Sequence, residues 1–184
     1  MTRRILVIEG TDCVGKTSVV QELQALIPRH NMVKLSAAPE PHMNIEYMKG
    51  VYQATIDLVN AAKYNHFIFD RFTTSERVYG WKHRSQNQED YDHLGTYEDQ
   101  LAELGGYHVL LIGSRMTLEA RLATKVLSHP NEAHYALEEL VELQRLYLEK
   151  MWNSSFPWSN QVVIETDGKT PREIALEIMR QTGV

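Results

Sequence analysis

The sequence has little of several features that mark particular classes of protein. Cysteine occurs once in 184 residues, as Cys13, so no internal disulfide can form and a disulfide-stapled secreted scaffold is excluded. No apolar run approaches the length of a membrane-spanning helix. The eight histidines show no H-x-x-x-H spacing and no C-x-x-C motif occurs, so a structural metal site is not expected.

The sequence also lacks a basic excess, because its formal net charge is −5. General nucleic-acid binders are usually basic, so this class is disfavoured, although a local basic groove remains open. Met1 is followed almost directly by an apolar run that is too short for a signal peptide. We therefore expect a single domain over residues 1–184 of a cytoplasmic, intracellular protein with no membrane partner. A phage-encoded origin and a homodimer both remain open.

One motif carries most of the functional information that is present. Residues 10–17 read G-x-x-x-x-G-K-T and lie between the apolar run 5–8 and a helical pattern that stops at Pro28. Strand, glycine loop and helix form the context of a phosphate-binding loop, whose backbone N–H groups and helix N-terminus attract phosphate. Lys16 is expected to reach the terminal phosphates, and the Thr17 hydroxyl to bind Mg²⁺. The predicted phosphate-binding residues are Gly10, Cys13, Val14, Gly15, Lys16, Thr17 and Ser18.

Short apolar runs and helical patterns alternate along the chain. Strands are predicted at 5–8, 32–35, 66–69, 109–112 and 161–164. Helices are predicted at 44–62, 92–104, 117–127 and 134–152, and a last one follows a capping box at 170–173. This alternation predicts an α/β fold, with a five-stranded parallel sheet covered by helices on both faces. The polar residues 80–92 are predicted to form a surface loop.

A second motif follows the strand at 66–69. Asp70 and Arg71 lie at its carboxyl end, which in open α/β sheets is the edge where ligands bind. Both side chains are therefore expected to project toward the same edge as the loop at 10–17. A surface ion pair at the end of a strand is the alternative interpretation.

The residues around these two motifs resemble a family of enzymes. Residues 70–79, Asp-Arg-Phe-Thr-Thr-Ser-Glu-Arg-Val-Tyr, match the D-R-[YF]-x-x-S-x-x-x-Y signature of thymidylate kinases and resemble the E-R-S signature of deoxynucleoside kinases. Residues 9–17 are similar to the thymidylate kinase form E-G-x-D-x-x-G-K-T, and Pro39-Glu40-Pro41 resembles the E-P dipeptide of both families. The resemblance covers almost the whole chain. It implies a three-layer P-loop kinase fold with a short helical LID over about residues 115–135.

The resemblance also implies roles for individual residues. ATP is the phosphoryl donor and Mg²⁺ the cofactor, with the adenine near Asp167 and Gly168. Arg71 holds the acceptor phosphate or the attacking oxygen, while Asp70 either binds Mg²⁺ through water or accepts the proton of a 5′-hydroxyl. The implied catalytic residues are Lys16, Asp70, Arg71 and Arg121, and the implied Mg²⁺ ligands are Thr17 and Asp70. The implied acceptor-binding residues are Asp12, Glu40, Arg71, Phe72, Tyr79 and Trp81, and those of the LID are Arg121 and Lys125.

Two departures from the family pattern concern the acceptor. Thymidylate kinases have an arginine beside the E-P element, whereas no arginine or lysine occurs at 36–44. The LID is also poor in arginine, because Arg121 is followed only by Lys125 and two histidines up to His134. The acceptor can therefore carry less phosphate charge than dTMP, or none. Residues 81–84, Trp-Lys-His-Arg, could hold a nucleic-acid strand or form a solvated basic turn.

The leading prediction is an ATP- and Mg²⁺-dependent kinase of a nucleoside or nucleotide, most like a deoxynucleoside monophosphate kinase. Rival enzyme predictions are a deoxynucleoside kinase and a phage-type kinase of 5-hydroxymethyluracil in DNA. A nucleotide-switched binding protein is the non-enzyme rival, although no N-K-x-D motif of guanine recognition occurs. At single positions, Glu40 is also compatible with a simple turn, and Arg121 and Lys125 with a solvated helix face.

Overall fold

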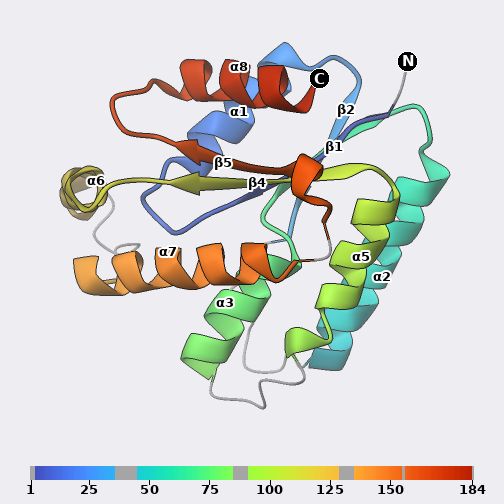
Figure 1. The fold of residues 1–184 in the computed structure, drawn as a ribbon, viewed down its shortest axis with the longest axis horizontal. Coiled ribbons are helices and arrows are strands. Elements are labelled where there is room, and N and C mark those ends of the chain that lie inside the picture. The colour runs from blue at the N-terminus through green and yellow to red at the C-terminus, as the bar shows by residue number, and fades with distance from the viewer. Residues whose placement is uncertain (1–2, 36–44, 85–90, 129–134, 155, 184) are drawn as a thin grey trace.

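The computed structural model describes residues 3–35, 45–84, 91–128, 135–154 and 156–183 (Figure 1). Five parallel strands form one sheet in the order β2-β3-β1-β4-β5. The strands are β1 (Ile5–Glu9), β2 (His30–Lys34), β3 (His66–Asp70), β4 (Gly106–Ile112) and β5 (Gln161–Glu165). The predicted parallel sheet is confirmed, and β1 lies at its centre.

Helices cover both faces of this sheet. They are α1 (Lys16–Leu26), α2 (Ile45–Ala61), α3 (Thr73–Arg84), α5 (Gly95–Glu103), α6 (Arg115–Ser128), α7 (Leu137–Trp152) and α8 (Pro171–Thr182), with a 3-10 turn at Trp158–Asn160. In Figure 1, α1 and α8 lie on one face, and α2, α3, α5 and α7 on the other, which gives three layers. None of the described helices is long and apolar enough to span a membrane.

Successive side chains of β1 pack into different layers of the core. Leu6 and Ile8 are buried with residues of α1 and α8, whereas Ile5 and Val7 are buried with residues of α2 and α5. Neighbouring residues of a strand point to opposite faces, so a strand that is buried on both faces is apolar at every position. This explains the continuous apolar run that predicted the strand.

The last helix begins as its sequence predicts. The Thr170 hydroxyl accepts a hydrogen bond from the backbone N–H of Glu173, and the Glu173 carboxylate accepts one from the N–H of Thr170. Pro171 occupies the first helical turn, where its missing N–H leaves no hydrogen bond unmade. The capping box is confirmed.

The prediction of a surface loop at 80–92 is wrong at both ends, because α3 continues to Arg84 and Tyr91 is buried in the core. Gly80, the first residue of that predicted loop, is helical and has a packing role. A Cβ at Gly80 would overlap the ring of Tyr91, so glycine here allows the following segment to pack closely on the helix. Residues 85–90 lie outside the described part of the chain.

Candidate active site

The loop between β1 and α1 curls as a phosphate-binding loop requires. Gly10, Cys13 and Gly15 have positive φ angles of 143°, 64° and 94°. A Cβ at Gly10 would lie only 2.6 Å from the carbonyl oxygen of Leu111, so no other residue fits there without moving the backbone. Helix α1 begins directly after Gly15, which aims its N-terminus at the loop.

Lys16 is folded onto this loop. Its ammonium donates hydrogen bonds of 2.6 Å to the carbonyl oxygens of Gly10 and Thr11, and the residue is almost completely buried. Burial lowers the pKa of Lys16 to about 7, with a further lowering by Arg71, although Asp12 and Glu9 oppose it. Added negative charge beside the ammonium would favour its protonated form. The loop is therefore suited to an anionic ligand.

A cavity of about 850 Å³ opens beside the loop. It brings together residues from the end of β1, the end of β3, α3 and α6, which are far apart in the sequence. The predicted site residues that line it are Asp12, Cys13, Val14, Gly15, Lys16, Thr17, Ser18, Asp70, Arg71, Tyr79, Arg121 and Lys125. Gly10 does not line the cavity, but its backbone conformation shapes the loop.

Arg71 lines the cavity and lies in a left-handed turn with φ of 72°. One terminal nitrogen, Nη2, donates to the Asp12 carboxylate over 2.7 Å. The other, Nη1, donates to the Tyr147 hydroxyl over 2.9 Å and to the Ser75 hydroxyl over 3.2 Å. Its guanidinium also lies 5.0 Å from the centre of the Tyr79 ring. Asp70 and Arg71 thus both face the cavity, as predicted, and the alternative of a surface ion pair between them is not observed, because Arg71 pairs with Asp12 and Asp70 lies beside Lys34.

Asp12 and Tyr79 complete the charged side of the cavity. The Tyr79 hydroxyl donates to the Asp12 carboxylate over 3.3 Å and accepts from the Asp12 backbone N–H over 3.2 Å. Burial alone would raise the pKa of Asp12, but Arg71, and after it Lys16, outweigh burial and lower it. Asp12 is therefore held as a carboxylate.

Asp70 and Thr17 offer oxygen ligands on the same cavity. Asp70 is 5% exposed, and its carboxylate lies 3.7 Å from the ammonium of Lys34. Carboxylate and hydroxyl oxygens are the donors that Mg²⁺ prefers, and this ion usually completes its shell with phosphate and water. In the described residues no group of three or more His, Cys, Asp or Glu side chains could hold a metal alone. The residues fit Mg²⁺ that is shared with a bound nucleotide.

Arg121 and Lys125 extend from α6 toward the phosphate-binding loop. Arg121 donates to the carbonyl oxygen of Val14 over 2.6 Å and to the hydroxyl and carbonyl oxygens of Thr166 over 3.0 and 3.2 Å. These bonds connect the loop to the end of β5. Burial raises the pKa of Cys13, so the single thiol has no sign of an activated nucleophile.

Of the predicted acceptor residues, Phe72 does not line the cavity, and two others lie outside what the structure describes. The side chain of Phe72 is fully buried against Tyr52 and Phe69, so it lies in the core and not on the cavity wall. The aromatic position in the motif has a packing role here. Glu40 lies outside the described residues, as does the side chain of Trp81.

The structure adds three residues to the site that the sequence did not single out: Glu9, Ser75 and Tyr147. Each is buried and connected to Arg71 directly or through one hydroxyl. Ser75 could have been identified from the sequence, because it is the serine of the 70–79 motif. Tyr147 fits a core position of an amphipathic helix, and nothing in the sequence shows that its hydroxyl reaches Arg71.

No protein-family model matches the sequence, and no curated protein matches it. The chain is similar in structure to the tunicamycin resistance protein of Deinococcus radiodurans, at 15% identity and a TM-score of 0.62, with 99% of this chain and 96% of that chain covered. It is similar to deoxyadenosine kinase from M. mycoides, at 17% identity and a TM-score of 0.59, with 98% and 100% covered. It is also similar to thymidylate kinase from Candida albicans, at 16% identity and a TM-score of 0.57, with 99% and 93% covered. The chain therefore has the P-loop kinase fold.

Proposed function

We propose that the protein is an ATP- and Mg²⁺-dependent phosphotransferase that acts on a nucleoside or nucleotide. The observation that carries this proposal is that the phosphate-binding loop and the charged end of β3 line the same cavity. A non-catalytic nucleotide binder needs the loop, but it has no need of Asp70 and Arg71 on the same cavity. The kinases with the same fold, which include a deoxyadenosine kinase and a thymidylate kinase, support the class of reaction.

The residues suit a transfer that depends on positioning and on neutralising charge. The backbone of the loop and Lys16 hold the donor phosphates, and bound Mg²⁺ would supply further neutralisation between Thr17 and Asp70. Arg71 holds the acceptor beside them through its planar guanidinium. Residues 115–135 act as the LID, in which Lys125 faces the loop and Arg121 supports it from the side of β5.

The acceptor most like the family pattern is a deoxynucleoside monophosphate. A deoxynucleoside is the second candidate, and one observation favours it. The guanidinium of Arg71 is already paired with Asp12 at 2.7 Å, so an acceptor phosphate would compete with an ionised carboxylate, whereas a sugar hydroxyl would not. A modified base in DNA is the third candidate.

The test is an acceptor panel with radiolabelled ATP, containing dTMP, dAMP, thymidine, deoxyadenosine and DNA with 5-hydroxymethyluracil. We expect transfer to at least one of them. Lys16→Met should lower that transfer at least about 100-fold, because it removes a preorganised cation from the transferring phosphate. Lys49→Met, at a lysine paired with Glu46 outside the cavity, is the matched control and should leave the rate unchanged. ATP hydrolysis without transfer to any acceptor would reject the proposal.

A further inference from the structure

Glu9 lies behind the candidate site and does not line the cavity. It ends β1, and its side chain is fully buried. One carboxylate oxygen, Oε1, accepts hydrogen bonds from the backbone N–H groups of Phe72 over 2.8 Å and Ser75 over 3.3 Å. The other, Oε2, accepts from the Ser75 hydroxyl. The carboxylate therefore caps the first turn of α3, next to the strained turn at Arg71.

Two hydroxyl groups connect Glu9 to Arg71. The Ser75 and Tyr147 hydroxyl oxygens are 2.7 Å apart, and both lie within hydrogen-bond distance of Arg71 Nη1. A guanidinium can only donate and a carboxylate can only accept. The hydroxyl protons between them must therefore point away from the arginine. Arg71 donates to Tyr147, Tyr147 donates to Ser75, and Ser75 donates to Glu9.

We propose that Glu9 is a positioning residue for phosphoryl transfer: as the final acceptor of this chain, it turns the Ser75 and Tyr147 hydroxyls so that their oxygens hold the guanidinium of Arg71 in place for the acceptor. The inference rests on the proposed function, in which Arg71 binds the acceptor. Burial raises the pKa of Tyr147 well above its usual value, so this hydroxyl keeps its proton. Burial also raises the pKa of Glu9 to about 7, against the effects of Ser75 and Arg71, so measurements at pH 8.5 test the ionised carboxylate.

Glu9→Gln separates this role from simple capping of α3. The amide oxygen can still accept from the N–H groups of Phe72 and Ser75, so the cap is kept. The amide nitrogen then lies where Oε2 accepted, and it donates toward Ser75. This reverses the hydroxyl chain and turns a proton toward Arg71. The variant therefore changes the direction of the hydrogen bonds with little change of shape.

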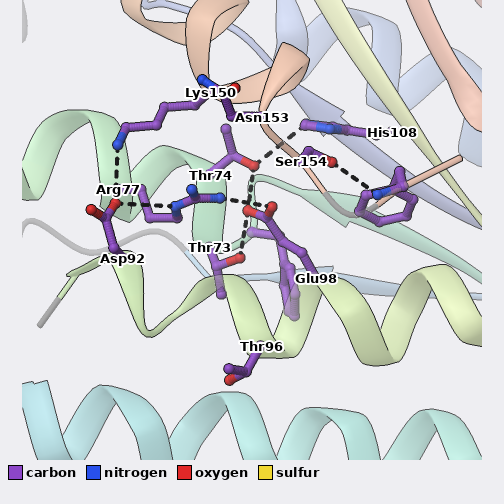
Figure 2. Close-up of polar contacts among 12 residues, drawn as sticks. Thr73, Thr74, Arg77, Asp92, Thr96, Glu98, His108, Lys150, Asn153 and Ser154 are labelled. Carbon is purple, nitrogen blue, oxygen red and sulfur yellow. Dashed lines mark hydrogen bonds and ion pairs between the residues drawn. The ribbon is translucent and has the colours of Figure 1, made fainter. Parts of the chain in front are cut away.

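Glu98→Gln is the matched control. Glu98 belongs to α5, and its buried carboxylate is the second one that contacts the start of α3. It accepts hydrogen bonds from the hydroxyls of Thr73 and Thr74 and from Arg77 (Figure 2). None of these contacts involves Arg71. A variant that only loosens α3 should therefore act alike at both positions, whereas the proposal requires a difference between them.

The first measurement needs no acceptor. Carbon-detected NMR of labelled arginine at pH 8.5 should show two separate Nη signals for Arg71 in the wild-type protein, because its bonds to Asp12 and Tyr147 restrain rotation. The signals are assigned by their loss in Arg71→Lys. They should merge or broaden in Glu9→Gln and in Ser75→Ala, and stay separate in Glu98→Gln. Two separate signals retained in Glu9→Gln would overturn the proposal, whether or not the panel of acceptors succeeds.

The second measurement is kinetic, with whichever acceptor of the panel reacts fastest. Glu9→Gln should lower kcat/KM for this acceptor about 10-fold, because a small displacement of a positioning group is costly, while the KM for ATP stays unchanged. Combined with Tyr147→Phe, it should add little further loss, since both variants break one chain. Equal losses for ATP and acceptor, or full additivity with Tyr147→Phe, would contradict the role. If the wild-type protein transfers phosphate to no acceptor of the panel, the proposed function is rejected. The NMR result still tests whether Glu9 positions the guanidinium of Arg71.

Discussion

The loop expected to hold the donor and the turn expected to hold the acceptor lie at neighbouring strand ends, yet different interactions fix them. The loop at 10–17 is shaped by its own backbone, with Gly10 and Gly15 in conformations that favour glycine. The turn at Arg71 has a positive φ without glycine, and side chains from other elements hold it. A site for a common ligand such as ATP can thus be encoded locally, whereas the acceptor side depends on long-range contacts.

The start of α3 shows how those long-range contacts work. Glu9 accepts a hydrogen bond from the backbone N–H of Phe72, just before the helix. Glu98 of α5 accepts one from Arg77 over 3.0 Å (Figure 2). Asp92 lies 3.9 Å from Arg77 and also pairs with Lys150. Burying two carboxylates at the start of one helix costs free energy, so hydrogen bonds to both carboxylates must offset this cost.

Gly10→Ala is expected to have the largest effect, and it acts on the donor side. The new Cβ would lie 2.6 Å from the carbonyl oxygen of Leu111, at a φ of 143°. Overlap and backbone strain together should lower the free energy of unfolding by about 4 kcal/mol and abolish ATP binding. Urea unfolding and calorimetric titration with ATP measure both effects.

Gly105→Ala is the matched control, because this glycine has a φ of 77° but no atom within 4 Å of the added Cβ. It should cost only about 1 kcal/mol of backbone strain and leave ATP binding intact. Equal losses in the two variants would show that conformation alone, rather than the close contact with β4, requires glycine at position 10.

Glu98→Gln should have the next largest effect, on stability alone. It removes the charge partner of Arg77, whose side chain is 9% exposed, and leaves a buried cation with only a distant pairing to Asp92. We expect a loss of about 3 kcal/mol in the free energy of unfolding. Below the melting temperature, kcat/KM for the acceptor should stay within about twofold of wild type, which a steady-state assay would check. A loss specific to the acceptor would show that Glu98, and not Glu9 alone, controls Arg71 through the start of α3.

Much of the donor side could be predicted because its signals are local. The glycines, Lys16 and Thr17 lie within eight consecutive residues, and the alternation of apolar runs predicted the sheet that presents them. Asp70 and Arg71 could be placed on the same edge because all strands of the sheet are parallel. The cavity they share with the loop follows from these rules.

The acceptor side could be predicted only in part. Arg71 and Tyr147 are 76 positions apart, and a tyrosine at a core position of a helix gives no sign of its hydrogen-bond partner. Phe72 was assigned to the acceptor from its motif, but an aromatic side chain after a buried strand can equally turn into the core, as it does here. Gly80 was included in a predicted surface loop, because the sequence does not show that the Tyr91 ring packs against it and leaves no room for a side chain.

The pH dependence of stability offers a smaller effect that isolates Glu9. Its pKa is raised by burial from 4.5 to about 7, so the folded protein binds this proton more tightly than the unfolded chain. The resulting stability is fully present below pH 4.5 and is lost as the pH rises through 7. Between pH 5 and pH 8, wild type should therefore lose about 2 kcal/mol relative to Glu9→Gln, as measured by urea unfolding at each pH. Parallel stability curves for the two proteins would contradict the raised pKa.

Tyr79→Phe should have the smallest effect, and it tests how far the acceptor side depends on single hydroxyls. The ring that lies under Arg71 is kept, while the hydrogen bonds to the Asp12 carboxylate and backbone are lost. We expect a cost of about 1 kcal/mol, seen as a roughly fivefold higher KM for the acceptor with the KM for ATP unchanged. Tyr64→Phe, at a tyrosine that is 89% exposed, is the control and should change neither KM. If Tyr79→Phe instead raises the KM for ATP, the hydrogen bonds of Asp12 serve the donor loop. The backbone would then not be sufficient to hold the donor side, and the contrast with an acceptor side held by side chains would fail at Asp12.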